Sequence, residues 1–202
     1  HGRLGEKDVL DNVFGLGSSN TFKKVKRIQF VACGTSLHAA KTARKWFEDI
    51  CETPCHIDFA SEYRYRHPLV ENKTLFVSIS QSGETADTLA AAREAKRLGA
   101  RVLSIVNIVG SSLARESDGV IYTRCGPEIS VASTKAFTGQ IVALYLLALH
   151  LGRVRGELTK DDGQWWLDQL MMLPGQVDHV MRRETDLITI AKQFYEKQNF
   201  LY

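Results

Sequence analysis

Three short segments of the sequence combine hydroxyl side chains with the start of a helical pattern. They are residues 33–36 (Cys-Gly-Thr-Ser), 80–85 (Ser-Gln-Ser-Gly-Glu-Thr) and 130–134 (Ser-Val-Ala-Ser-Thr). The first turn of a helix exposes N–H groups that lack intrahelical partners, and it carries partial positive charge, so it favours an anion. Hydroxyl groups add hydrogen-bond donors without bulk. These segments therefore predict the binding of a phosphate or another small anion.

The segment 80–85 carries the strongest signal. With Ser82 as the N-cap of a helix that begins at Gly83, the hydroxyls of Ser80, Ser82 and Thr85 would converge on one phosphate. Gly83 allows the backbone to approach a ligand closely. Glu84 would repel a phosphate, so we expect its carboxylate to point away and to interact with the helix dipole. The alternative is that these segments are ordinary helix caps without a ligand, since cap residues are common.

The same segments argue against a nucleotide as the ligand. The sequence contains no Walker A motif, and no GxGxxG follows its first expected strand. Residues 33–36 hold a single glycine, whereas a pyrophosphate needs a second one for close approach. A single small phosphate, as on a sugar, fits better.

Reactive side chains near these segments have ordinary interpretations. Cys33 could be a nucleophile at a helix N-terminus, but no histidine is placed as its base, so a small residue at a strand end is favoured. Lys135 could neutralise a phosphate or form an imine, and a solvated or structural lysine is the favoured reading. His38 lies one turn into its helix, which favours a surface or packing role. Asp87 and Glu94 share a helix without a partner carboxylate, so we interpret them as a solvated face.

Alternating strand and helix patterns would bring the three segments together. Short apolar runs predict strands at 28–32, 56–59, 75–79, 101–106 and 119–122, with helices at 36–51, from 83 to about 98, and from about 135 to 152. This alternation predicts an α/β fold with a parallel sheet and helices on both faces. In such a sheet ligands bind beyond the carboxyl ends of the strands, where all three segments lie.

The remaining residues divide the chain into further parts. Residues 1–24 are polar and glycine-rich and predict a lead-in, while 25–152 form the α/β domain. Residues 153–198 show helical periodicity only, and Pro174 is expected to break them into at least two helices. Residues 199–202 look like the first strand of another domain that is cut short, so we expect a truncated chain.

Composition excludes several classes of protein. The chain has 202 residues, 44% hydrophobic and 24% charged, with a net charge of +3, which rules out disorder and gives no reason to expect nucleic acid as a partner. The longest apolar run, 141–151, is too short to cross a bilayer, so no membrane partner is expected. Four cysteines in a chain of this size predict reduced thiols and a cytoplasmic location. The spacing of Cys51 and Cys55 is too loose for a metal site, and we expect no metal and no cofactor.

Several longer runs resemble a known family. They are residues 32–36, 60–66, 80–89, 110–118 and 131–137 (Val-Ala-Ser-Thr-Lys-Ala-Phe). Together they resemble the isomerase half of the glucosamine-6-phosphate synthases, also called glutamine:fructose-6-phosphate aminotransferases (isomerising). The resemblance is to the first of two SIS (sugar isomerase) domains, and it implies a three-layer αβα, flavodoxin-like fold with a five-stranded parallel sheet and extra C-terminal helices.

The resemblance also implies roles for ten residues. Its phosphate contacts fall on Ser36, Ser80, Gln81, Ser82 and Thr85, and its sugar contacts fall on Cys33, Gly34, Thr35, Val131 and Ser133. In this family an imine-forming Lys, a proton-shuttling Glu and a ring-opening His lie in the second SIS domain or the C-terminal tail. None has a matching position here, so no catalytic residue is predicted, and Lys135 is not the imine lysine.

The implied function is that of one part of a larger enzyme. The family converts fructose 6-phosphate and glutamine to glucosamine 6-phosphate, and implied ligands are fructose, glucose and glucosamine 6-phosphates. Implied partners are a glutaminase domain, a second SIS domain and a second copy in a homodimer, and the chain alone is expected to be inactive. Three alternatives stay open: a free-standing SIS sensor of sugar phosphates, a related SIS isomerase or deglycase, and a flavodoxin-like domain without a phosphate site.

Overall fold

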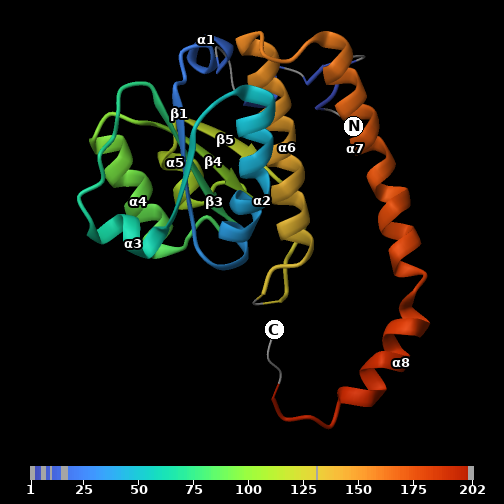
Figure 1. The fold of residues 1–202 in the computed structure, drawn as a ribbon. Coiled ribbons are helices and arrows are strands. Elements are labelled where there is room, and N and C mark those ends of the chain that lie inside the picture. The colour runs from blue at the N-terminus through green and yellow to red at the C-terminus, as the bar shows by residue number, and fades with distance from the viewer. Residues whose placement is uncertain (1–2, 6–7, 10, 15–17, 131, 200–202) are drawn as a thin grey trace. The chain divides into compact units, whose positions relative to one another are not determined.

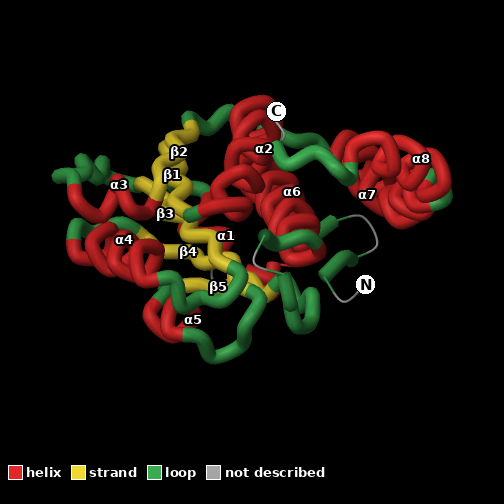
Figure 2. Tube along the Cα trace, turned by 90° about the horizontal axis from the view of Figure 1, so that it is seen from below, coloured by secondary structure: helices red, strands yellow, loops and turns green. Residues whose placement is uncertain are grey.

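A five-stranded parallel sheet forms the centre of the computed structural model, which describes residues 3–5, 8–9, 11–14, 18–130 and 132–199. The strand order is β2-β1-β3-β4-β5 (Figure 2). The strands are β1 (Arg27–Ala32), β2 (Cys55–Phe59), β3 (Thr74–Ser80), β4 (Arg101–Val106) and β5 (Gly119–Tyr122). The predicted α/β fold with a parallel sheet is confirmed, and each predicted strand is present within a residue of its expected limits.

The burial of the strands explains why their sequences are continuous apolar runs. All seven residues of β3 are buried, because helices cover both faces of the sheet. In the register, Ala32 of β1 pairs with Ile79 of β3, and Ser80 of β3 pairs with Val106 of β4. The carboxyl ends of these three strands are therefore level, and the turns that follow them start side by side.

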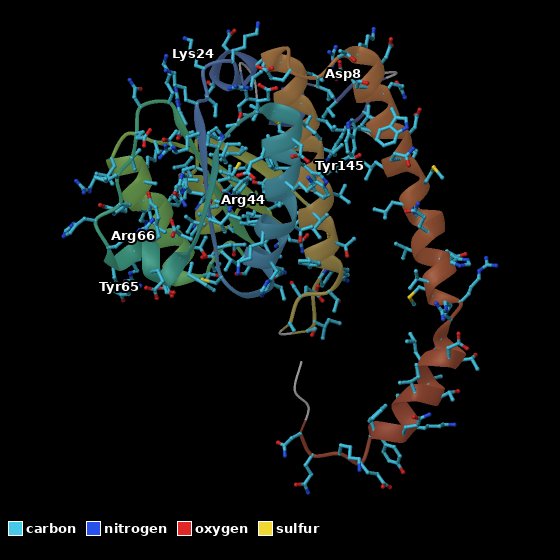
Figure 3. All side chains as sticks on the ribbon, in the orientation of Figure 1. Asp8, Lys24, Arg44, Tyr65, Arg66 and Tyr145 are labelled. Atoms are coloured by element: carbon cyan, nitrogen blue, oxygen red, sulfur yellow. The ribbon has the colours of Figure 1, made fainter. Side chains whose placement is uncertain are left out.

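Two helical layers cover the sheet, as Figures 1 and 2 show. Helices α2 (Gly34–Cys51) and α6 (Lys135–Arg155) pack against each other on one face, and α3 (Ala60–Tyr65), α4 (Ala86–Arg97) and α5 (Ser112–Glu116) cover the other. Side chains fill the space between sheet and helices (Figure 3). Tyr145 of α6, for example, packs edge-on against Trp46 of α2 with ring centroids 5.0 Å apart. The three-layer arrangement matches the one that the resemblance implies.

The lead-in contributes two short elements to the same body. They are the 3-10 helix η1 (Asp11–Phe14) and α1 (Ser18–Phe22). The rings of Phe14 and Phe22 both contact the imidazole of His150 in α6, with centroid distances of 4.5 and 5.7 Å. His150, which interrupts the apolar run of the sequence, is thus a core residue in an aromatic cluster.

The helix that begins at Lys135 is long and apolar enough to cross a membrane by length and composition alone. However, 61% of its most apolar window is buried inside the protein. The core helix of a globular domain has the same properties, because it is apolar all round when other elements cover it. Packing against α2 and the sheet therefore accounts for the composition of α6.

Two helix starts differ from those predicted. Helix α2 begins at Gly34, ahead of the expected start at residue 36, and Cys33 is its N-cap. Helix α4 begins at Ala86 with Thr85 as its N-cap, not Ser82. In the second case the carbonyl of Gly83 accepts the N–H of Leu113, while the N–H of Leu89 donates to the carbonyl of Thr85, so the hydrogen bonds of the helix begin at Thr85.

The chain divides into two compact units, residues 1–163 and 164–202. Helix α7 (Lys160–Met181) runs into the second unit, which also contains α8 (Glu184–Phe194). The expected break at Pro174 is wrong, since Pro174 lies inside α7. Proline removes one N–H donor and so leaves the carbonyl of Leu170 without its intrahelical partner; Pro174 is exposed and Leu170 is half-buried. Residues 200–202, nearly all of the expected C-terminal strand, lie outside the described residues.

Candidate phosphate-binding site

A pocket of about 240 Å³ lies at the carboxyl ends of β1 and β3, where the three hydroxyl-rich segments meet. Its lining contains nine of the ten predicted site residues, and the tenth, Val131, lies outside the described residues. The nine are Cys33, Gly34, Thr35, Ser36, Ser80, Gln81, Ser82, Thr85 and Ser133, joined by Ile79, Thr88 and Ser130. The fold thus brings together segments that are almost a hundred residues apart in sequence.

Hydrogen bonds inside the loop 80–85 orient its hydroxyls. The Ser80 Oγ accepts the N–H of Gly83 at 3.0 Å and lies 3.3 Å from the Thr85 Oγ1. The Ser82 Oγ accepts the N–H of Glu84 at 3.2 Å. A hydroxyl that accepts a backbone N–H keeps its own proton for another partner. Ser82 in particular is set to donate to an anion at this place.

A close approach requires glycine at position 83. Its φ is +68°, and a Cβ built there would lie 2.2 Å from the Oγ of Ser111 and 2.6 Å from the Ser111 Cβ. The N–H of Leu113 donates to the Gly83 carbonyl at 3.0 Å. The loop 80–85 is therefore pressed directly onto the segment that follows β4. Gly83 thus serves this contact between loops, while the close approach to a ligand stays a prediction.

The carboxylate of Glu84 points away from the pocket, as expected, but toward a different helix. Its Oε1 accepts the N–H of Ser112 at 2.7 Å, and Ser112 is the first residue of α5. This backbone hydrogen bond lowers the pKa of Glu84 below its ordinary value. Glu84 therefore caps α5 rather than its own helix, and it adds a third tie between the loop 80–85 and the segment after β4.

A second carboxylate holds the third segment of the site. The Oε2 of Glu128 accepts the N–H groups of Thr134 and Ala136, each at 3.1 Å, at the start of α6. These backbone bonds, that of Ala136 first, lower the pKa of Glu128. Sequence reasoning missed this residue, although an acidic residue a few positions before a helix is a recognisable capping signal. Glu128 fixes the stretch that contains Ser133.

Thr88 is a further lining residue that the sequence analysis missed. It is buried on α4, one turn after Thr85, and its hydroxyl lies 3.9 Å from the Sγ of Cys33. Residues three apart on a helix lie on the same face, which is the signal that could have found it. Thr88 joins α4 to the turn after β1.

The described lining of the pocket offers neutral hydrogen-bond donors and no charged side chain. Among the described residues that line it there is no Asp, Glu, Lys, Arg or His. Cys33 is half-buried in this lining without a histidine beside it, and neither Lys135 nor His38 belongs to the lining. The arrangement can bind and orient an anion through neutral donors, and it offers no acid, base or nucleophile pair of the kind that catalysis needs.

Comparisons with known proteins agree with this geometry. The SIS domain family model matches residues 21–150. A glutamine–fructose-6-phosphate aminotransferase (isomerizing) of Pseudomonas syringae pv. tomato is 49% identical over 202 residues, which cover 100% of this chain and 33% of that protein. A protein of the same name from Clostridium tetani is 40% identical over 98% of this chain and 32% of its own length. The chain thus spans about a third of the length of the curated relatives it matches.

Solved structures extend the comparison. The C-terminal domain of glucosamine-fructose-6-phosphate aminotransferase from Francisella tularensis matches with a TM-score of 0.93 and 39% identity, over 97% of this chain and 55% of that one. A glucosamine-6-phosphate deaminase from Thermotoga maritima, 24% identical over 74% of this chain and 49% of that one, shares the fold alone with a TM-score of 0.60. These comparisons confirm the resemblance to the glucosamine-6-phosphate synthases. Because the SIS domain model matches residues 21–150, more than half of the chain, the chain belongs to the SIS domain family.

Proposed function

We propose that this chain is the sugar-phosphate-binding SIS domain of a glutamine:fructose-6-phosphate aminotransferase (isomerising), an enzyme of amino-sugar biosynthesis. The observation that carries the proposal is that three hydroxyl-rich segments line one pocket. Identity of 49% across the whole chain to a protein of that name supports this enzyme over SIS proteins that share the fold alone.

The ligand would lie with its phosphate on the loop 80–85. There it would accept hydrogen bonds from the hydroxyls of Ser82 and Thr85, while its sugar extends toward Thr35 and Ser133 across the same pocket. Hydrogen bonds from neutral donors to a charged phosphate contribute about 1.5–3 kcal/mol each. The donors of one loop and one helix start would thus suffice to select a phosphorylated sugar over the free sugar.

The groups that perform the chemistry would come from elsewhere in a longer polypeptide. Opening the sugar ring and moving a proton between two carbons require an acid and a base at the sugar. The described lining offers neither, so we propose that a second SIS domain supplies them and a glutaminase domain supplies ammonia. We also propose that the complete enzyme is a homodimer and that it is located in the cytoplasm.

Calorimetric titration tests the binding role. We expect the chain to bind fructose 6-phosphate and glucose 6-phosphate but not glucose, and the double variant Ser82→Ala/Thr85→Ala to weaken phosphate-ester binding at least about tenfold. Thr42→Ala is the matched control, because its hydroxyl donates to the carbonyl of His38 on the exposed face of α2, outside the pocket lining.

The titration is repeated with the complete polypeptide that carries this chain. If that polypeptide binds neither sugar phosphate, the proposed function is wrong. If the 202-residue chain alone forms glucosamine 6-phosphate from fructose 6-phosphate and ammonia faster than buffer, the assignment of a purely binding role is wrong.

A further inference from the structure

Both polar atoms of the Asn107 side chain, and its backbone N–H, form hydrogen bonds at the edge of the candidate site. Asn107 directly follows β4 and is 7% exposed. Its Oδ1 accepts the N–H of Cys125 at 2.8 Å and the hydroxyl of Thr123 at 3.0 Å, and its Nδ2 donates to the carbonyl of Gly126 at 2.7 Å. Its backbone N–H donates to the carbonyl of Gln81 at 3.1 Å. One residue therefore joins the phosphate-binding loop to the segment after β5.

That segment has no strand or helix of its own to hold it. Residues 123–129 form neither, and two of them, Arg124 and Gly126, have positive φ values of 54° and 70°. The sheet ladder ends where the N–H of Thr123 donates to the Val106 carbonyl. Beyond this point the amide of Asn107 supplies the partners that a neighbouring strand would otherwise supply.

The segment 123–134 is thus tied at two places. Asn107 holds its beginning at residues 123–126, and Glu128 holds its end at the first turn of α6. Ser130 and Ser133, which line the pocket, lie at the end of this segment. Their distance from the loop 80–85 depends on both ties.

We propose that Asn107 is a positioning residue that sets the segment bearing Ser130 and Ser133 at a defined distance from the phosphate-binding loop. The proposal rests on the proposed function, since it takes the ligand to bridge the two. The backbone N–H of residue 107 secures the phosphate end of the site, and its side chain secures the sugar end. Changing the side chain should therefore weaken recognition of the sugar while leaving recognition of phosphate nearly unchanged.

Asn107→Asp makes this separation testable through pH. The variant keeps an oxygen for Cys125 and Thr123, but it places a second oxygen against the Gly126 carbonyl, which repels it when ionised. Once protonated, the same carboxyl can donate to that carbonyl and restore the bond. The charged and titratable neighbours are Arg124 and Cys125 of the segment, together with Arg3, whose guanidinium donates to the Tyr122 carbonyl and interacts with both. Comparison with wild type at each pH corrects for them and for the ionisation of the ligand.

The experiment measures affinities for fructose 6-phosphate and for inorganic phosphate in the complete polypeptide that carries the chain. We expect Asn107→Asp and Asn107→Ala to weaken fructose 6-phosphate binding about tenfold at pH 8, and inorganic phosphate binding by less than about threefold. Lowering the pH through the titration of the introduced carboxyl should bring Asn107→Asp, but not Asn107→Ala, back toward wild type, because the protonated carboxyl can donate to the Gly126 carbonyl. Amide exchange of Cys125 should also be faster in Asn107→Ala.

Ser104→Ala is the matched control. The Ser104 hydroxyl is fully buried and lies 2.5 Å from the hydroxyls of Ser78 and Ser117, within the sheet and away from the pocket lining. This variant should lower the unfolding temperature without changing the ratio of the two affinities.

Equal losses for both ligands, or wild-type affinity of Asn107→Asp at pH 8, would show a merely structural role and overturn the inference. If the wild type binds neither fructose 6-phosphate nor inorganic phosphate, the proposed function is wrong, and the role proposed for Asn107 is wrong with it. If Asn107→Ala does not fold, the pH response of Asn107→Asp still decides between these outcomes.

Discussion

Replacing Gly83 by alanine perturbs the candidate site at one point and separates two physical effects. Gly83 has a left-handed φ of +68°, and its missing Cβ leaves room for Ser111. Alanine introduces both backbone strain and a clash, whereas the same change at Gly99 introduces strain alone. The φ of Gly99 is +89°, with no atom within 4 Å of a built Cβ.

The size of each effect follows from the geometry. A non-glycine residue in the left-handed region costs about 1–2 kcal/mol. A Cβ placed 2.2 Å from the Ser111 Oγ and 2.6 Å from the Ser111 Cβ must displace one loop from the other, and overpacking of this kind costs about 1–3 kcal/mol. We therefore expect Gly83→Ala to lower the free energy of unfolding by about 2–5 kcal/mol, and Gly99→Ala to lower it by about 1–2 kcal/mol.

A second substitution recovers the part due to the clash. The Oγ of Ser111 is buried and, within the described part of the chain, has no hydrogen-bond partner. Glycine at this N-cap of α5 loses only a few tenths of a kcal/mol, so Ser111→Gly opens space beside residue 83 at about that cost. The double variant Gly83→Ala/Ser111→Gly should therefore be about 1–3 kcal/mol more stable than the two single losses predict by addition.

Urea unfolding followed by far-ultraviolet circular dichroism measures all four free energies, and phosphate affinity is measured alongside. Gly83→Ala should also weaken phosphate binding, because the loop that carries Ser82 must move. If Gly83→Ala is no less stable than Gly99→Ala, or if Ser111→Gly recovers nothing, the contact between the two loops does not restrain residue 83 and the reasoning fails.

Two further predictions concern titration and accessibility. The pKa of Glu128 is lowered by backbone hydrogen bonds, so its contribution to stability is present above the usual carboxyl pKa of 4.5 and is lost as the pH falls through its own lower value. Glu128→Gln should have a lower unfolding temperature than wild type at pH 7, and this difference in unfolding temperature should shrink below pH 4.5. A difference that is the same at both pH values would contradict the capping role. Iodoacetamide at neutral pH should alkylate Cys33 before Cys51 and Cys55, because burial raises the pKa of the Cys51 thiol to about 12 and also raises that of Cys55. Fructose 6-phosphate should protect Cys33 from alkylation, since Cys33 lines the pocket. Peptide mass spectrometry measures the order, and earlier labelling of Cys51 in the folded chain would contradict it.

The fold was predictable because its main signals are local. Residues 101–106 and 119–122 form strands at the expected positions, since short apolar runs between turn residues indicate buried parallel strands. Helices α3 and α5 were not expected, because five or six residues are too few to show a helical period. The prediction at Pro174 was wrong because the rule that proline ends a helix is a tendency, and α7 continues through this exposed position.

The candidate site was predictable in its residues but not in its supports. The segments 33–36 and 80–85 directly follow β1 and β3, so parallel topology brings them to one edge, whereas the segment 130–134 is held there by the ties of Asn107 and Glu128. The partners of Gly83, Glu84 and Asn107, however, lie between 16 and 30 positions away in sequence, in Ser111, Ser112 and the segment after β5. The hydrophobic periodicity of the sequence does not predict such contacts, because they depend on the conformation of each loop and its distance from the neighbouring loop.

The composition of the pocket sets what this domain can contribute to a reaction. The lining consists mainly of hydroxyl-bearing residues, with one thiol and one amide, and has no Asp, Glu, Lys, Arg or His among its described residues. Under the proposed function it would bind a phosphate dianion through several neutral donors instead of a counter-charge. Affinity of this kind depends on the number of donors that reach the phosphate at once, so it is sensitive to loop position and only slightly to salt. It also leaves the sugar end free of fixed charge. Under the proposed function, another domain can then supply the acid and base that act on the sugar, and no charged side chain that binds the phosphate interferes with them. What this domain itself contributes is the exact placement of the two loops that hold the ligand.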